Sequence, residues 1–465
     1  MADKQAKFLS GSLFRHVMTM SLTSSVGLMA IFAVDFIDMI FIAMLGKAEL
    51  AAAVGYAATI LFFTTSFGIG MAIAAGALVA RALGAGDVKL ATQRSTHALI
   101  YGVAFGSVFA VAVWMNLAPI VGLLGADGQT AQFAISYLKI IVPTLPLLMI
   151  GMMGGAILRA HGDARRAMMA TIYGGLVNAV LDPILIFGLD LELAGAAFAS
   201  VAARIVIATT ALLPIIHHHG GVGRPRVMGM ARDLPPIAAI AFPAILTQLA
   251  TPVGQAIVTR SMAEFGEAAI AGMAIVGRLS PLAFGVIYAL SGAVGPILGQ
   301  NYGARDYDRV RRGLQAALIF VGLVIVGISA VLFTLRAPVS DLFNATGTTR
   351  DLVYLFCGPL SLLFFFNGVL FVANATFNNL GHPFYSTFLN WGRNTIGMIP
   401  LVMLGSSLMG AQGVLIGQAL AGVIFGVLAW WLAYRVIQKA PDEVKPKTSE
   451  FGRQGRLMSL FYLRR

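Results

Sequence analysis

The stretch LFRHVMTMSLTSSVGLMAIFAVDFIDMIFIAML, residues 13–45, decides the fold because it is long and apolar enough to cross a bilayer. Two acids, Asp35 and Asp38, lie inside it, and a third, Asp182, interrupts a second apolar run at 167–189. A charged side chain at the centre of a bilayer costs at least ~2.5–3.5 kcal/mol. Because such residues are typically retained for ion coupling or a substrate pathway, we expect these three acids to be functional.

The composition of the whole chain indicates a polytopic membrane protein. The 465 residues are 58% hydrophobic and 11% charged, with a mean hydropathy of +0.84, whereas soluble domains carry roughly 25% charged residues. The single cysteine, Cys357, lies in an apolar segment and is expected to be a small buried side chain. Twelve spans are predicted, at 17–44, 53–80, 95–120, 133–158, 167–189, 194–216, 237–262, 269–299, 314–336, 352–377, 384–404 and 411–434.

Lysine and arginine are concentrated in alternate loops, beginning with the N-terminus and ending with the C-terminal tail. Basic loops are typically cytoplasmic, so both termini are predicted to lie in the cytoplasm of a multi-pass protein of the bacterial inner (cytoplasmic) membrane. The N-terminus does not resemble a signal peptide, so the first span is expected to be retained. The net charge of +12 is spread over short loops, and we therefore expect no nucleic-acid partner.

Short motifs recur in the two halves of the chain in the same order. Gly84-Ala85-Gly86-Asp87 is echoed by Gly303-Ala304-Arg305-Asp306, and Leu193-Ala194-Gly195-Ala196 by Leu408-Met409-Gly410-Ala411. With six spans in each half, this is a parallel repeat. The predicted fold is an all-α polytopic membrane protein with twelve transmembrane helices in two pseudo-symmetric six-helix lobes around a central cleft. The predicted parts are a cytoplasmic N-terminus (1–12), an N-lobe (13–216), a cytoplasmic linker (217–236), a C-lobe (237–437) and a cytoplasmic tail (438–465).

Two lobes that rock about a shared cleft are typical of a secondary transporter. The chain has no Walker motif and no soluble domain that would hydrolyse ATP, so the driving force is expected to be an ion gradient. We expect no enzymatic activity and no cofactor, with the proton as coupling ion and sodium as the alternative.

Several motifs resemble those of MATE (multidrug and toxic compound extrusion) transporters, and the resemblance covers residues 10–437. The most specific is Asn178-Ala179-Val180-Leu181-Asp182-Pro183, which is similar to the family's fifth-span signature. Gly277-Arg278-Leu279 resembles the DinF-like branch. The other matching segments are 38–46 with the following 50–55, the loop 158–163, and 195–197.

The resemblance implies that Asp38, Asn178 and Asp182 form a cation-coupling group in the N-lobe. It places Tyr137 and Ser200 as supporting hydrogen-bonding partners, by looser matches. Asp35 is additional to the family motif.

The sequence departs from the family pattern at two places. Where many members have a proline in the first span, this chain has Thr23, whose repeat mate is Pro243, so a proline hinge in the first span is not expected. Sodium-coupled members often carry acids in the seventh and tenth spans, but residues 238–259 and 352–377 contain none. This favours proton coupling.

The spacing of the acids indicates how they would act. Asp35 and Asp38 are three residues apart and share a helix face, so we expect them to take up protons as a coupled pair. Asn178 precedes Asp182 by four residues, which allows its amide to orient that carboxylate. Alternatively, Asp182 satisfies backbone groups freed next to Pro183, and Asp35 is a solvated residue at the mouth of its span.

The predicted C-lobe side of the cleft is neutral or basic. Arg278 is expected to pair with an acid, with contacts to a carbonyl or a substrate as alternatives. Gln255 is the repeat mate of Asp35. Asn367 and Asn374 either line the cleft or form interhelical hydrogen bonds. Arg204 is expected to lie near the end of its span and extend towards the surface.

We therefore predict a proton-coupled antiporter that exports amphipathic organic cations by alternating access, conferring drug resistance. Its partners are expected to be small cationic amphipathic molecules and the lipid bilayer, and the protein is expected to be a monomer. The alternatives are a sodium-coupled MATE exporter, a lipid-linked oligosaccharide flippase of related fold, and a transport-inactive sensor or scaffold. No metal site is expected.

Overall fold

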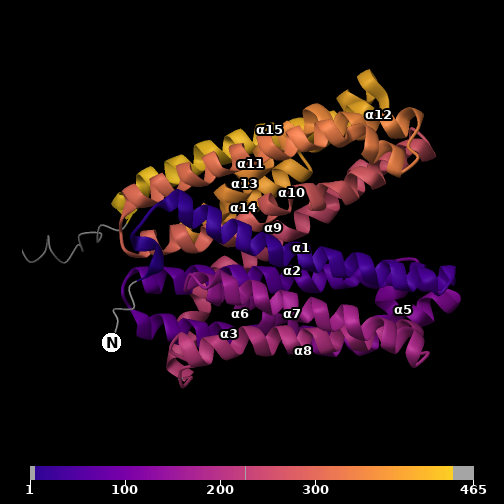
Figure 1. The fold of residues 1–465 in the computed structure, drawn as a ribbon. Coiled ribbons are helices and arrows are strands. Elements are labelled where there is room, and N and C mark those ends of the chain that lie inside the picture. The colour runs from indigo at the N-terminus through magenta and orange to yellow at the C-terminus, as the bar shows by residue number, and fades with distance from the viewer. Residues whose placement is uncertain (1–5, 226, 444–465) are drawn as a thin grey trace, which may run out of the picture.

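The computed structural model describes residues 6–225 and 227–443, which are helical apart from short connections and contain no strand. Figure 1 shows two bundles, one from each half of the chain. The first half forms η1 (Lys7–Leu9), α1 (Leu13–Met44), α2 (Ala48–Gly84), α3 (Val88–Met115), α4 (Leu117–Leu123), α5 (Gly128–Ile141), η2 (Val142–Thr144), α6 (Leu145–Ala160), α7 (Ala164–Pro183), η3 (Ile184–Gly188) and α8 (Glu192–His218). The second half forms α9 (Val227–Ala263), α10 (Glu267–Gly303), α11 (Tyr307–Leu342), α12 (Gly347–Leu355), η4 (Phe356–Leu360), α13 (Ser361–Leu380), α14 (Pro383–Asn394) and α15 (Met398–Glu443).

Within the described residues, 11 helical stretches are long and apolar enough to cross a membrane. The last one, Pro383–Pro441, has 59 residues and reverses direction at Gly410, where φ is 58° and ψ is −139°. On either side of this turn the backbones of Gly405 and Gly413 are in contact, since a Cβ added to Gly413 would lie 1.8 Å from the Gly405 carbonyl oxygen. The stretch therefore makes two antiparallel crossings. The twelve-helix, two-lobe fold predicted from the sequence is confirmed.

This hairpin leads to a first prediction about stability. Gly413→Val would place a branched side chain against the Gly405 backbone, and over-packing of this kind typically costs about 1–3 kcal/mol. We expect a lower melting temperature in detergent, followed by tryptophan fluorescence. Gly327→Ala is the control, because a Cβ there meets nothing within 4 Å. Equal melting temperatures for the two variants would contradict the proposed close contact.

A break at the same place in both halves reflects the repeat. The fourth span consists of α5 and α6 joined by η2, which contains Pro143. The tenth consists of α12 and α13 joined by the π-helical turn η4, which contains Pro359. Proline lacks a backbone N–H and its ring clashes with the preceding turn, so it interrupts a helix. Next to the second break, Cys357 is buried, as predicted.

The first helix of each half packs its first turns into the opposite lobe. Leu13, Val17 and Met20 of α1 belong to the same hydrophobic core as α10, α11 and α13. Ile237 and Ile240 of α9 belong to the core of α2, α3 and α6. The helix α9 begins at Val227, within the segment 217–236 that was expected to be a linker. The two lobes are thus joined by an exchange of helix ends that sequence boundaries alone do not reveal.

The lobes touch where α2 and α10 end, and we call this region the lobe junction: Arg81, Gly84, Gln300 and Gly303. A Cβ on Gly84 would lie 1.9 Å from the Gln300 carbonyl oxygen, and one on Gly303 would lie 2.1 Å from that of Arg81. These residues are repeat mates, so the contact is pseudo-symmetric. Figure 1 shows the lobes meeting near the N-terminus and diverging towards the other end.

The N-terminal segment reinforces the lobe junction. Phe8 is 1% exposed, and its backbone N–H donates to the Gln300 side-chain oxygen at 2.9 Å. The amide of Gln300 in turn donates to the Ala160 carbonyl at 2.8 Å, and Lys7 Nζ donates to the Gly162 carbonyl at 2.9 Å. Elements of both lobes are therefore tied together here. The predicted tail at 438–465 lies outside the described residues beyond Glu443.

Candidate functional site

The acids of the N-lobe are brought together by two helices packed side by side, α1 and α7. Glycines allow this approach: a Cβ on Gly27 of α1 would lie 2.7 Å from the Thr171 hydroxyl, and one on Gly175 of α7 would lie 2.9 Å from Val34. The packing places Asp38 opposite Asn178 and Asp182. Asp182 is fully buried and Asp38 partly so.

Asn178 connects the two carboxylates. Its side-chain N–H₂ group donates to Asp182 Oδ2 at 2.9 Å and to Asp38 Oδ1 at 3.3 Å. The first hydrogen bond is the one expected from the four-residue spacing. No backbone N–H in the described chain donates to Asp182, so the alternative in which this residue satisfies the helix break at Pro183 is not supported.

The remaining oxygen of Asp182 has no partner within the described chain in this conformation. Oδ1 is buried and has no hydrogen-bond donor among the described residues. Asp38 and Asp182 also interact electrostatically with each other. Two ionised carboxylates cannot donate to each other, so a hydrogen bond between Asp182 and Asp38 would require one of them to hold a proton. No ion pair to a lysine or arginine neutralises either acid in the described part of the chain.

The other predicted N-lobe residues surround this pair. Asp35 lies one turn from Asp38 and is exposed. Tyr137 of α5 interacts electrostatically with Asp38 and Asp182 and lies near Ser200 of α8. Asp35 is therefore adjacent to the central pair without belonging to its hydrogen-bonded group.

Arg204 does not extend to the surface as expected. Its guanidinium donates to the Ile141 carbonyl at 3.1 Å and to the Thr144 hydroxyl at 2.8 Å. Both acceptors lie at the proline break between α5 and α6, where helix carbonyls lose their usual partners. The break thus recruits a cation from α8, which explains an arginine within an apolar span.

A second stability prediction follows for Arg204. Arg204→Met keeps the length of the side chain but leaves the Ile141 carbonyl without its donor, which costs about 1–3 kcal/mol. We expect a lower melting temperature, with partial recovery in Arg204→Lys, which retains a donor. A methionine variant as stable as the wild type would show that the carbonyl finds another partner.

Of the four C-lobe residues that were considered for the cleft, two are exposed and two are buried. Gln255 and Arg278 are exposed, and the predicted ion pair of Arg278 is absent from the described residues, because no acid lies within 4 Å. Asn374 is buried and accepts from the Asn390 amide at 3.2 Å, which fits interhelical hydrogen bonding. Asn367 is buried too, and its side-chain oxygen lacks a donor within the described chain.

One buried polar pair was missed. His97 of α3 and Asp233 of α9 are almost fully buried, with His97 Nδ1 and Asp233 Oδ2 2.6 Å apart, and Gln93 Nε2 donates to the same oxygen at 3.3 Å. The pair connects the N-lobe to the first helix of the second half. His97 lies in the predicted span 95–120, where a polar side chain indicates a buried partner. Asp233 lies in the segment that was expected to be a linker, where an acid is ordinary.

Curated relatives match over nearly the whole chain. A protein named FAD transporter from Shewanella oneidensis is 26% identical over 443 residues, covering 92% of this chain and 96% of the relative. The multidrug export protein MepA of Staphylococcus aureus is 23% identical, covering 93% of this chain and 96% of the relative.

Solved structures share the fold. An outward-facing multidrug resistance MATE family transporter of the MOP superfamily superposes with a TM-score of 0.88 at 20% identity, covering 95% of this chain and 100% of that chain. A mutant of the Vibrio cholerae MATE transporter VcmN gives 0.86 at 23% identity, covering 93% and 98%.

The MatE family model matches this chain twice, at residues 24–184 and 243–404. The two matches confirm the internal repeat, because their first residues are 219 positions apart and their last residues 220. The matches include all of α7 with Asn178 and Asp182 and the part of α1 that carries Asp38. The chain therefore belongs to the MATE family of transporters.

Proposed function

We propose that this transporter exports amphipathic organic cations in exchange for protons, with Asp38 and Asp182 as the proton-binding pair. The observation that carries the proposal is the carboxyl pair bridged by Asn178, in which Asp182 is fully buried and one of its oxygens has no donor among the described residues. A carboxyl pair that lacks a basic partner changes its net charge when it gains or loses protons. This property is what proton coupling requires.

The position of the pair relative to α1 supports a mechanism of alternating access. The first turns of α1 pack in the C-lobe core, whereas its second half, with Asp38, packs against α7 of the N-lobe. A change of charge at Asp38 therefore acts on a helix that belongs to both lobes. Loss of the proton leaves a negative charge on both α1 and α7. The repulsion between these charges favours a different packing of α1.

The orientation of the molecule completes the proposal. The concentration of basic residues in alternate loops supports a cytoplasmic position for the lobe junction. This conformation, in which the lobes meet there and diverge at the other end, is then outward-facing. Protons from outside would bind the pair and release the exported cation, and proton loss to the cytoplasm would restore its negative charge.

The test is transport in proteoliposomes with an imposed gradient. We expect efflux of ethidium, a cationic dye, to be driven by a proton gradient in sodium-free buffer and to be unaffected by a sodium gradient of equal size. Efflux that follows only the sodium gradient would overturn proton coupling. Absence of efflux under either gradient would overturn cation export.

A second candidate substrate is a flavin dinucleotide, favoured by the 26% identity to the Shewanella FAD transporter. FAD is an anion, and its export would place the substrate near the C-lobe, where Arg278 is exposed and Asn367 has an oxygen without a donor. Competition separates the two candidates. Inhibition of ethidium efflux by FAD, together with gradient-driven movement of FAD itself, would favour the flavin substrate.

A further inference from the structure

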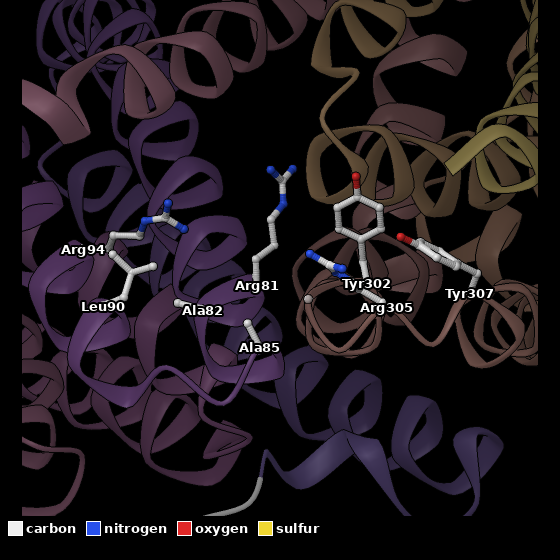
Figure 2. A pocket seen from close by; sticks show the side chains of 9 residues that line it. Arg81, Ala82, Ala85, Leu90, Arg94, Tyr302, Arg305 and Tyr307 are labelled. Carbon is white, nitrogen blue, oxygen red and sulfur yellow. The ribbon is translucent and has the colours of Figure 1, made fainter. Parts of the chain in front are cut away.

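A cavity of about 240 Å³ lies at the lobe junction, away from the carboxyl pair. One wall belongs to α2 and α3 of the N-lobe, and the other to the end of α10, the connecting turn and the start of α11 of the C-lobe. Figure 2 shows its polar side chains. The residues that line it are Arg81, Ala82, Ala85, Leu90, Arg94, Tyr302, Gly303, Arg305 and Tyr307.

Positively charged residues surround the cavity. Three of its lining residues are arginines and none is an acid. In Figure 2 the side chains of Arg94 and Arg305 extend towards Arg81 from opposite sides. Asp87 and Asp233 act on Arg94 from outside the lining, with the Asp233 carboxylate 4.0 Å from Arg94 Nε. These two acids partly balance the charge of Arg94. Arg81 and Arg305 have no acid in the lining of the cavity.

Two polar atoms of lining residues lack a partner. Arg94 Nε and the Tyr307 hydroxyl are both buried from solvent, and neither has a hydrogen-bond partner within the described residues. The Arg81 guanidinium is held by the carbonyls of Asn379 and Asn378, at 2.6 and 2.7 Å, and lies over the Tyr302 ring. Beside the cavity there is thus a fixed cation, together with one donor from each lobe that has no hydrogen-bond partner among the described residues.

The backbone at Arg305 provides an independent observation. Its φ is 59°, a left-handed conformation that costs a non-glycine residue about 1–2 kcal/mol. At the equivalent turn of the N-lobe the repeat mate is Gly86, with φ of 76°. The C-lobe copy therefore carries a strained arginine where glycine would be unstrained, and strain of this kind is characteristic of functional positions.

We infer that the cavity binds an oxyanion of the phosphate type, which bridges the two lobes through Arg94 on one side and Arg305 on the other. A phosphate group presents several acceptor oxygens at once, and guanidinium groups match that geometry. Both a phospholipid headgroup and free phosphate offer this chemistry.

The site would also regulate the protein, and this part rests on the proposed function. The cavity exists only while α2 and α10 meet, so an anion bound there stabilises the conformation closed at the lobe junction. A ligand shifts a conformational equilibrium by its difference in affinity for the two states. A bound anion is therefore expected to slow the return to the other conformation.

Binding is tested without any transport assay. The purified protein in phosphatidylcholine nanodiscs is titrated with inorganic phosphate at constant ionic strength, and the melting temperature is followed. We expect a saturable increase in the wild type. Arg305→Asn should weaken phosphate binding by about tenfold or more, the effect of losing one charged contact. Asparagine tolerates the left-handed backbone, so this variant should fold.

The matched control is Arg311→Asn, which removes the same charge from the start of α11. Arg311 stacks on the Tyr434 ring, 5.2 Å from its centroid, and does not line the cavity. It should bind phosphate as the wild type does. Equal weakening in both variants, or no phosphate effect in the wild type together with no lipid effect in the next experiment, would overturn the inference.

Lipid composition identifies the source of the phosphate. In phosphate-free buffer, nanodiscs that contain phosphatidylglycerol are compared with phosphatidylcholine nanodiscs. Stabilisation by phosphatidylglycerol that Arg305→Asn abolishes and Arg311→Asn retains would support the site with a lipid headgroup as ligand. Stabilisation only by the soluble ion, with the same dependence on Arg305, would support it with free phosphate as ligand. Because neither measurement involves transport, failure of the site and failure of the proposed function remain distinguishable.

Discussion

Replacing either member of the carboxyl pair is expected to abolish transport driven by a proton gradient. Asparagine has nearly the same shape as aspartate, but its side chain neither gains nor loses a proton at neutral pH. In Asp38→Asn and Asp182→Asn the pair therefore cannot cycle between its protonated and deprotonated forms. We expect ethidium efflux in proteoliposomes with an imposed pH gradient to fall to the level of protein-free vesicles.

Asp35→Asn is the matched control, because it removes the same charge from the same helix one turn away. Asp35 is exposed and outside the hydrogen bonds of Asn178. Exposed substitutions away from such contacts typically change free energies by about 0.5 kcal/mol, roughly a twofold effect. Efflux near the wild-type rate is therefore expected. Wild-type efflux in Asp38→Asn or Asp182→Asn would exclude the pair as the coupling site.

The acids of the N-lobe could be picked out from the sequence because their signals are local. Acids in apolar spans are costly, so their positions stand out, and the spacing of Asn178 and Asp182 follows from helix geometry. The contact between Asp38 and Asn178 is a different matter, since it joins residues that are 140 positions apart. Only the family resemblance pointed to it, and composition or spacing would have paired Asp38 with Asp35.

The spans were predictable for the same reason, but several contacts between elements were not. Hydrophobicity locates a helix without stating which neighbour it meets, so the exchange of α1 and α9 between lobes stayed hidden. The predicted surface position of Arg204 was wrong because the carbonyl and the hydroxyl to which it donates lie about 60 residues away, at a proline break. Polar residues are satisfied by tertiary partners, which a linear pattern does not specify.

The second large effect is expected at the lobe junction. In Gly84→Ala the added Cβ would lie 1.9 Å from the Gln300 carbonyl oxygen, and both partners are backbone, so neither side can rotate away. Over-packing typically costs about 1–3 kcal/mol, which shifts an equilibrium by roughly tenfold or more. The cost applies only while α2 and α10 meet. The substitution should therefore depopulate this conformation and reduce efflux, while the lobes themselves stay folded.

Gly55→Ala separates this effect from a general effect on the helix, since Gly55 is also in α2 but a Cβ there meets nothing within 4 Å. Both substitutions gain the same helix propensity, about 1 kcal/mol in favour of alanine. Hydrogen exchange of the backbone amides at 300–306 should become faster in Gly84→Ala and stay unchanged in Gly55→Ala. Gly303→Ala, the repeat mate, meets the Arg81 carbonyl in the same way and should reproduce the result. Wild-type efflux and wild-type amide exchange in both junction variants would contradict this prediction. Closure at this end of the molecule would then not depend on the glycine contacts between α2 and α10.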